Sequence, residues 1–215
     1  AAAADVLLRL GRWDDADELV AEGRSLDPAG EGPLYLVIVR LRLATARGIV
    51  VVEAGCNGGY DLDAYANLSG KKIFDRASAD FRDSGAIMVG ASSSATPHTR
   101  MSFSNFGSRV DCYAWGENID TASTDNAGTD NTLYTTAFGG TPAASPMIAG
   151  ALLIVQGLAQ STLGYRFSPR ELRRILASTG TASANPAVDE IGIMPDLRAI
   201  IVGNQLNLAP DIYLR

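Results

Sequence analysis

The sequence has little of the chemistry from which disulfide frameworks and metal centres are built. Its 215 residues include only two cysteines and one histidine. Two cysteines are too few for a disulfide framework, so we expect Cys56 and Cys112 to be buried free thiols. Zinc, phosphate-loop and dinucleotide-binding signatures are absent, and the run from Gly55 to Gly59 lacks the glycine spacing of a dinucleotide loop. The sequence therefore predicts no cofactor.

An excess of positive charge and long apolar runs are also missing. The net charge is −6, and Lys and Arg are spread along the chain, which excludes a basic patch for nucleic acid. Uninterrupted apolar runs such as residues 34–39 and 49–52 are far shorter than the about 20 residues of a membrane span. The first ten residues lack a secretory signal, and without an initiator Met we expect a processed or truncated piece. We expect a peptide or protein partner, and neither nucleic acid nor a membrane.

The first 45 residues are predicted to form a helical segment. Apolar residues recur there at three- and four-residue spacing, Pro28 ends the first helix, and a second helix is predicted over 34–46. The pattern of Leu10, Ala16, Val20 and Pro28 resembles the second half of a tetratricopeptide repeat. No second copy follows at a 34-residue period, and a lone repeat cannot bury its own face. We therefore favour an amphipathic α-helical hairpin that packs on the rest of the protein.

Beyond residue 46 the pattern changes to alternating strands and helices. Runs of β-branched and apolar residues, typical of strands buried in a parallel sheet, occur at residues 49–54, 86–90 and 109–114. Helices are predicted over 142–158 and 169–179, and the second begins with a capping box from Ser168 to Glu171. The longest polar stretch, residues 116–131, is predicted to be a loop. This alternation predicts an α/β fold of three layers with a mainly parallel sheet.

Two motifs in this part resemble those of the subtilisin-like serine peptidases, the subtilase family. The first is Gly48-Ile-Val-Val-Val-Glu-Ala-Gly-Cys-Asn57-Gly-Gly. The second, Gly140-Thr-Pro-Ala-Ala-Ser-Pro-Met-Ile-Ala-Gly150, is similar throughout to the family's Gly-Thr-Ser-x-Ala-Ser-Pro-x-x-Ala-Gly. With a closing strand-turn-helix at 192–199, the resemblance covers residues 46–202 and leaves 203–215 as a tail. It implies the C-terminal half of a peptidase domain, and so a partial subtilisin-like domain.

The resemblance implies a role for Asn57 in the oxyanion hole. In the family this side-chain amide donates to the oxygen on which charge develops, and such a donor lowers the barrier by roughly 3–4 kcal/mol, a magnitude measured on subtilisin itself. The alternative is a loop asparagine that only shapes the turn before Gly58 and Gly59. The flanking strand and the second motif favour the oxyanion role.

At the family's nucleophile position this sequence has Pro142. Proline has no hydroxyl to attack a carbonyl and no N–H to donate to an oxyanion. The rest of the motif is kept in Gly140, Thr141, Ser145 and Pro146. Ser145 matches the second serine of the motif, which faces the structure in the family, so we do not expect it to replace the nucleophile.

The acid and base of the triad are also missing. In the family an Asp motif, a His motif and a substrate-lining Ser-Leu-Gly-Gly strand precede the oxyanion Asn, and here the helical segment takes their place. The only histidine, His98, follows Asn57 and precedes residues 101–107, which resemble the family's Phe-Ser-Asn-x-Gly stretch. We expect His98 to be a solvent-facing loop residue. Without a base, even a restored serine would be a weak nucleophile.

Three aspartates in the long polar stretch, Asp120, Asp125 and Asp130, suggest a calcium site, since subtilisin-like proteins often bind this ion. Their five-residue spacing does not match an ordered calcium loop such as the EF-hand. We therefore favour a solvated loop.

Two hypotheses for the function follow. The chain is a subtilisin-like serine endopeptidase in incomplete and inactive form, or a non-catalytic protein-binding module built on the peptidase scaffold and the helical segment. The upstream coding sequence would discriminate between them. In both cases we expect Asn57 and Pro142 to lie close together at the C-terminal edge of the sheet. Unless the N-terminal helices shield it, we also expect one uncovered sheet edge that favours self-association.

Overall fold

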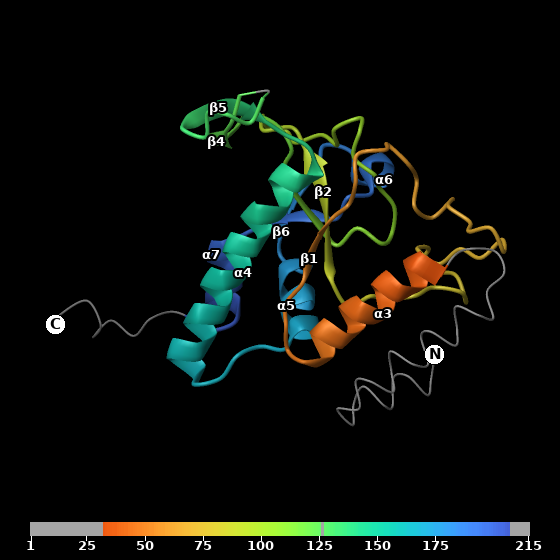
Figure 1. Ribbon diagram of the computed structural model, residues 1–215. Helices are drawn as coiled ribbons and strands as arrows, with labels where there is room; N and C mark the ends of the chain where they lie inside the picture. The colour runs from red at the N-terminus through yellow and green to blue at the C-terminus, as the bar shows by residue number, and fades with distance from the viewer. Residues whose placement is uncertain (1–31, 126, 207–215) are drawn as a thin grey trace.

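The protein's structure, a computed structural model, describes residues 32–125 and 127–206 (Figure 1). Its helices are α3 (Gly32–Ala46), α4 (Thr141–Leu163), α5 (Pro169–Leu176), α6 (Pro186–Asp189) and α7 (Leu197–Gly203). Its strands are β1 (Val52–Ala54), β2 (Ile87–Ser92), β3 (Cys112–Trp115), β4 (Ile119–Ser123), β5 (Leu133–Phe138), β6 (Gly180–Ala182) and β7 (Ile193–Pro195). The tetratricopeptide-like pattern at residues 10–28 and most of the predicted tail lie outside the described residues.

A five-stranded sheet in the order β1-β2-β3-β7-β6 forms the centre of the fold. β1, β2, β3 and β7 are parallel neighbours, and only β6 is antiparallel to its partner β7. In the register Val52 lies opposite Ile87, and Val89 opposite Cys112. The mainly parallel α/β sheet predicted from the β-branched runs is thus confirmed.

The two faces of the sheet are covered differently. Alternate residues of β2 and β3 join the buried side chains of α4, α5 and α7 in the larger apolar core. On the opposite face, Met88 and Tyr113 pack against apolar side chains that come mostly from loops, among them Leu62, Phe74 and Phe106. The helical face therefore holds most of the buried apolar surface, which is the dominant stabilising term of a fold.

Helix α4 is the longest element of the described chain. Its buried residues pack on β1, β2 and β3, and it extends to Leu163, five residues beyond its predicted end. Pro142 is its second residue, after Thr141 and not at its start. By length and composition α4 is also the one helix among the described residues that is apolar enough to cross a membrane.

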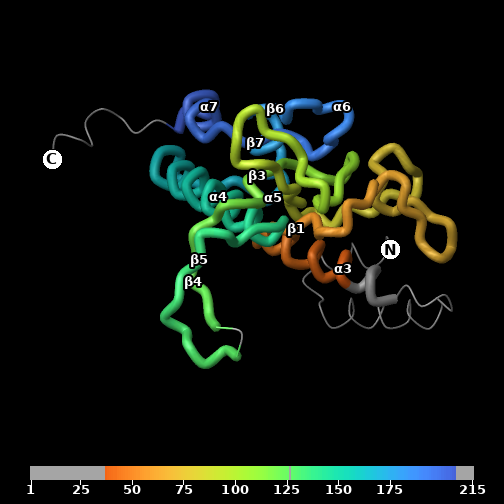
Figure 2. The backbone as a smooth tube through the Cα atoms, turned by 90° about the horizontal axis from the view of Figure 1, so that it is seen from above, coloured from red at the N-terminus to blue at the C-terminus, as the bar shows by residue number. Residues whose placement is uncertain are grey.

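The prediction of a loop over residues 116–131 is wrong for residues 119–123, which form β4. β4 and β5 pair antiparallel and form a hairpin that projects from the rest of the molecule (Figure 2). The strands are rich in Thr, Ile and Tyr, which favour β-structure, but the polar Gly- and Asp-containing turn between them suggested a loop. Asp125 closes that turn by accepting hydrogen bonds from the amides of Thr129 and Asp130.

Candidate functional site

The site begins where β1 ends and the chain turns sharply toward Asn57. The Gly55 amide donates to the Val89 carbonyl at 2.8 Å, and a Cβ on Gly55 would lie 2.9 Å from that same oxygen. Cys56 then adopts a left-handed conformation, with φ of 69°. This approach of two backbones requires a glycine, and the turn places Asn57 beyond the carboxyl end of β1.

Asn105 holds the next part of this loop, and we did not identify it from the sequence as a site residue. Its Oδ1 accepts hydrogen bonds from the amides of Gly58 at 3.2 Å and Tyr60 at 2.9 Å. Asn105 is almost fully buried. It belongs to the Phe-Ser-Asn-x-Gly stretch, and that resemblance was the signal that could have identified it.

The carboxamide of Asn57 is oriented by the first residue of α4. Its Oδ1 accepts hydrogen bonds from the amide and from the hydroxyl of Thr141, both at 2.9 Å. Because the oxygen is used in this way, Nδ2 points to the other side and remains a donor. Thr141 is fully buried. In the sequence it looks like a helix cap, but in the structure it positions the side chain of Asn57.

Gly140 brings Asn57 and Pro142 together. Its φ of 90° is in the region that favours glycine, and its amide donates to the Gly116 carbonyl at 2.8 Å. A Cβ at Gly140 would lie 3.0 Å from Asn57 Nδ2 and 3.1 Å from Pro142 Cδ. The two residues that the motifs single out are therefore neighbours at the carboxyl edge of the sheet, where ligands bind in open α/β folds.

Pro142 is exposed and has neither a hydroxyl nor an N–H at this point. The amides of the next two residues, Ala143 and Ala144, point back to the Gly140 carbonyl at 3.0 and 3.3 Å. The amide of Thr141 is taken by Asn57. Of the groups that form the start of α4, none donates outward, so Asn57 Nδ2 is the donor that the described residues offer to an oxyanion.

The two remaining motif residues lie on α4 without contact to a substrate position. Ser145 is half-buried, and its hydroxyl donates to the Thr141 carbonyl at 2.9 Å, one turn back along the helix. Pro146 is exposed in the next turn. The hydroxyl of Ser145 is thus directed at the helix backbone, which is typical of a serine in a helix interior.

The expectation that His98 faces solvent is wrong. The residue is only 4% exposed, and its Nδ1 lies 2.9 Å from the Ser93 carbonyl. Its ring packs edge-on against Tyr113 and near Trp115. The loop folds back on itself through the Ser93 amide, which donates to the Thr99 carbonyl, and this buries the ring. None of these contacts involves Asn57 or Pro142.

The cysteines also differ from their prediction. Cys112 is fully buried in β3 as expected, and burial raises the pKa of its thiol, so it is inert. Cys56 is exposed, because the left-handed turn after β1 directs it away from the core. Both are free thiols, and the expectation of a buried Cys56 is wrong.

The aspartates considered for calcium lie on the projecting hairpin. Hydrogen bonds from Thr129 and Asp130 hold the pKa of Asp125 below its ordinary value, and those from Thr132 do the same for Asp130. Both oxygens of Asp125 and the Oδ1 of Asp130 thus already accept from protein donors. Among the described residues, no three acidic, His or Cys side chains lie together as metal ligands.

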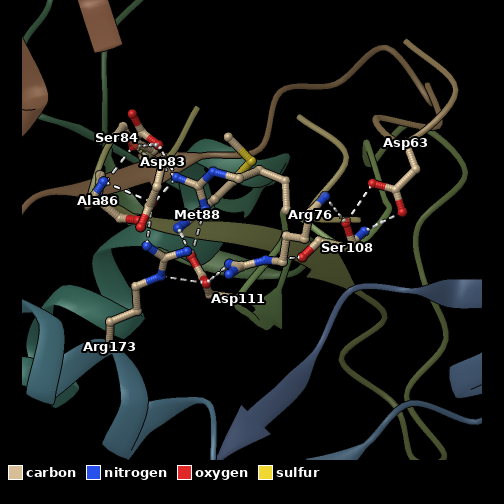
Figure 3. Close-up of polar contacts among 12 residues, drawn as sticks. Asp63, Arg76, Asp83, Ser84, Ala86, Met88, Ser108, Asp111 and Arg173 are labelled. Atoms are coloured by element: carbon tan, nitrogen blue, oxygen red, sulfur yellow. Dashed lines mark hydrogen bonds and ion pairs between the residues drawn. The ribbon is translucent and has the colours of Figure 1, made fainter. Parts of the chain in front are cut away.

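A second polar cluster lies at the amino ends of the strands, centred on Asp111 (Figure 3). Its carboxylate pairs with Arg76 at 2.6 Å, Arg109 at 2.9 Å and Arg173 at 2.7 Å, and accepts from the Met88 amide at 2.8 Å. Asp111 and Arg109 are almost completely buried. This network was not predicted, because its partners come from β2, from α5, from the residues just before β3 and from a distant loop.

Two further acids complete the cluster. Arg109 also pairs with Glu53 of β1 at 3.0 Å, and Arg173 with Asp83 at 2.6 Å. Burial raises the pKa of Glu53, although Arg109 opposes the shift. The cluster joins β1, α5 and the residues just before β3 at the amino ends of the strands, opposite the site. It therefore holds the scaffold and takes no part in the chemistry around Asn57.

Comparison with known proteins supports the family resemblance that the two motifs indicate. A model of the subtilase family of peptidases matches residues 25–192. The chain is 32% identical over 135 residues to subtilisin-like protease 2 of Pseudogymnoascus destructans and 31% identical over 139 residues to an extracellular protease of Xanthomonas campestris pv. campestris. These matches cover 63% and 65% of this chain but only 28% and 21% of the two relatives.

Solved structures show the same fold. A protease from Pseudoalteromonas arctica superimposes with a TM-score of 0.56 at 21% identity, over 77% of this chain and 46% of that one. The self-cleaved protease domain of PatA superimposes with a TM-score of 0.55 at 19% identity, over 80% of this chain and 56% of that one. This chain therefore spans about half of these solved structures and a quarter or so of the curated relatives. On the family match over residues 25–192, the chain belongs to the subtilase family.

Proposed function

We propose that this chain carries a subtilisin-like site that does not hydrolyse peptide bonds. The observation that supports the proposal is Pro142, which stands beside the oriented amide of Asn57 where the family has its nucleophile. Acyl transfer to a serine needs a hydroxyl, a base that takes its proton and donors for the oxyanion. The site retains one donor, Asn57 Nδ2, and residues 32–125 and 127–206 offer no replacement for the hydroxyl or the base.

The lack of a base supports the same conclusion. The single histidine of the chain, His98, is buried and is bound to the Ser93 carbonyl. A general base must reach the proton that it removes, directly or through one water molecule. The contacts that the structure shows for His98 are with β3, with its own loop and with the Ala184 amide, and none is with Asn57 or Pro142, so it does not meet this requirement.

A cleavage assay with casein and a library of fluorogenic peptides tests the proposal. We expect no hydrolysis by the wild-type chain and none by Pro142→Ser, because that variant gains a hydroxyl without a base. Pro146→Ser is the matched control, since it places a serine at an exposed position one turn further along α4. Hydrolysis by the wild-type chain that Asn57→Ala reduces would contradict the proposal.

A non-catalytic protein-binding module is the second candidate, and the preserved orientation of Asn57 favours it. A free amide donor beside an exposed Pro142 can hold a peptide carbonyl without cleaving the peptide. Binding of fluorescein-labelled casein peptides, followed by anisotropy, tests this function. Asn57→Ala should weaken the binding several-fold, and Asn131→Ala on the hairpin, also exposed, should leave it unchanged.

A further inference from the structure

The β4–β5 hairpin stands apart from the rest of the molecule. It projects alone in both views, away from α3 and α7, the first and last described elements (Figures 1 and 2). The two strands pack chiefly on each other, and β5 is exposed along its length except at the half-buried Thr135. A two-stranded hairpin on its own is only marginally stable in water. A partner that packs on this hairpin would therefore stabilise it.

One face of the hairpin combines an aromatic ring with a carboxylate. Tyr134 lies opposite Ala122 in the register. Half-buried and exposed residues alternate through β4, which places Asp120 on the same exposed face as Ala122. Asp120 is thus a diagonal neighbour of Tyr134, about 7–8 Å away and within reach of an aromatic side chain. Tyr134 is 83% exposed. We call the surface formed by Asp120, Ala122 and Tyr134 the hairpin face.

The charge of the hairpin is of one sign. Residues 116–138 contain no Lys, Arg or His, and their acidic residues are Glu117, Asp120, Asp125 and Asp130. Hydrogen bonds within the turn hold the pKa of Asp125 and of Asp130 below its ordinary value, so both carboxylates stay ionised. These charges attract a positively charged partner. They repel nucleic acid, anionic membranes and a second copy of this chain, whose net charge is −6.

A guanidinium group fits the hairpin face. Arginine pairs with carboxylates and also stacks on aromatic rings, and the hairpin face offers both groups side by side in Asp120 and Tyr134. The protein already contains such a ring contact, since the guanidinium of Arg100 lies 4.1 Å from the ring centroid of Phe106. The two strands also form a sheet of their own without a third strand among the described residues. An extended polypeptide can therefore lie along β5.

We propose that the hairpin face docks an extended, arginine-bearing segment of a partner protein. An Arg side chain of the partner lies over the ring of Tyr134 and pairs with Asp120, and the other carboxylates of the hairpin attract the segment. The two ends of the hairpin meet beside the site, where the Gly140 amide donates to the Gly116 carbonyl at 2.8 Å. The docking nevertheless does not use Asn57, and it occurs whether or not the site hydrolyses peptides.

Fluorescence anisotropy with a labelled decapeptide of alternating Arg and Thr, at physiological salt, tests the proposal. Tyr134→Ala and Asp120→Asn should each weaken the binding about fivefold, the size expected for a surface cation–π contact or ion pair. The matched controls are Tyr165→Ala and Glu190→Gln, at exposed positions outside the hairpin, and they should leave the binding unchanged. Asn57→Ala should also have no effect, which separates this docking from the site.

Hydrogen exchange gives a second measurement that does not depend on the variants. The amides of β5 should exchange more slowly when the wild-type chain binds the Arg peptide, while those of β6 should not change. A wild-type chain that does not bind the Arg peptide, or that binds a peptide with Glu in place of Arg equally well, would overturn the proposal. So would equal losses in Tyr134→Ala and Tyr165→Ala. Binding to phosphatidylserine vesicles that Tyr134→Ala reduces would assign the hairpin face to a membrane instead and would also contradict it.

Discussion

The side-chain oxygen of Asn57 lies 2.9 Å from both the amide nitrogen and the hydroxyl oxygen of Thr141. The two residues are 84 positions apart in the sequence. Their contact joins the end of β1 to the start of α4, and it fixes which end of the carboxamide can donate. The contact thus holds Asn57, the residue that we propose as the oxyanion donor, in place beside Pro142.

A double-mutant cycle measures this contact. Thr141→Val removes the hydroxyl and keeps the shape, Asn57→Ala removes the acceptor, and the double variant removes both. We expect a coupling energy of about 1 kcal/mol in the free energy of unfolding by urea, the net value of one buried hydrogen bond. Strictly additive effects would show that the contact contributes nothing to stability.

The cluster around Asp111 predicts that a single substitution in it lowers the free energy of unfolding by a large amount. Asp111→Ala leaves Arg109, which is only 1% exposed, and Arg173 without their shared partner. Removal of one member of a buried ion pair costs about 3–5 kcal/mol, so urea or thermal unfolding should show a loss of that size. Asp120→Ala, at an exposed position of β4 on the hairpin, is the control, with an expected change below about 0.5 kcal/mol. Equal effects of the two substitutions would contradict this account of the cluster.

Asp83 predicts how stability depends on pH in the acid range. Burial alone would raise the pKa of this carboxyl, but the Gly85 amide and Arg173 outweigh burial and hold the pKa below its ordinary value of 3.8. The unfolded chain then takes up this proton at a higher pH than the folded chain does. The contribution of Asp83 to the free energy of unfolding is complete above pH 3.8. It is lost as the pH falls through the lower pKa that this carboxyl has in the folded chain.

The unfolding free energy, measured by urea titration from pH 5 downward, should therefore decrease more steeply for the wild-type chain than for Asp83→Asn. The difference should arise below pH 3.8. If both chains lose stability along the same curve, Asp83 is not held by its partners as the structure shows.

Calcium is predicted to have no effect on stability. Both carboxylate oxygens of Asp125 and the Oδ1 of Asp130 accept hydrogen bonds from the hairpin itself, and a ligand stabilises a fold only if it binds the folded state. The unfolding temperature should therefore be the same in EDTA and in millimolar calcium chloride. A rise with calcium that disappears in Asp125→Ala would place an ion on the hairpin.

Much of the scaffold could be predicted from local pattern. The β-branched runs gave the strands of the parallel sheet, and the capping box at Ser168 and Glu171 starts α5 as expected. The neighbourhood of Asn57 and Pro142 also follows from the sequence, because one residue ends a parallel strand and the other begins the helix that packs on that strand. Each of these signals lies within a few consecutive residues.

The features that were missed depend on contacts between distant segments. Arg109 and Glu53 are 56 residues apart and Asp111 and Arg173 are 62 apart, so no local pattern pairs them. His98 is in a polar stretch that resembles an exposed loop, yet the loop folds back and buries the ring against Tyr113. The β4–β5 hairpin was obscured by its polar turn, although its strands have clear β-propensity.

The most direct test of the central claim is reaction with a fluorophosphonate probe, followed by intact mass spectrometry. An active subtilisin, treated in parallel, should gain the mass of one probe. The account predicts no mass gain for this chain, because Pro142 offers no hydroxyl and the Ser145 hydroxyl donates a hydrogen bond to the Thr141 carbonyl within α4. Pro142→Ser should also remain unlabelled, since no base reaches the new hydroxyl. Stoichiometric labelling of the wild-type chain, mapped to Ser145 or to any other serine, would contradict the claim that this site does not carry out acyl transfer.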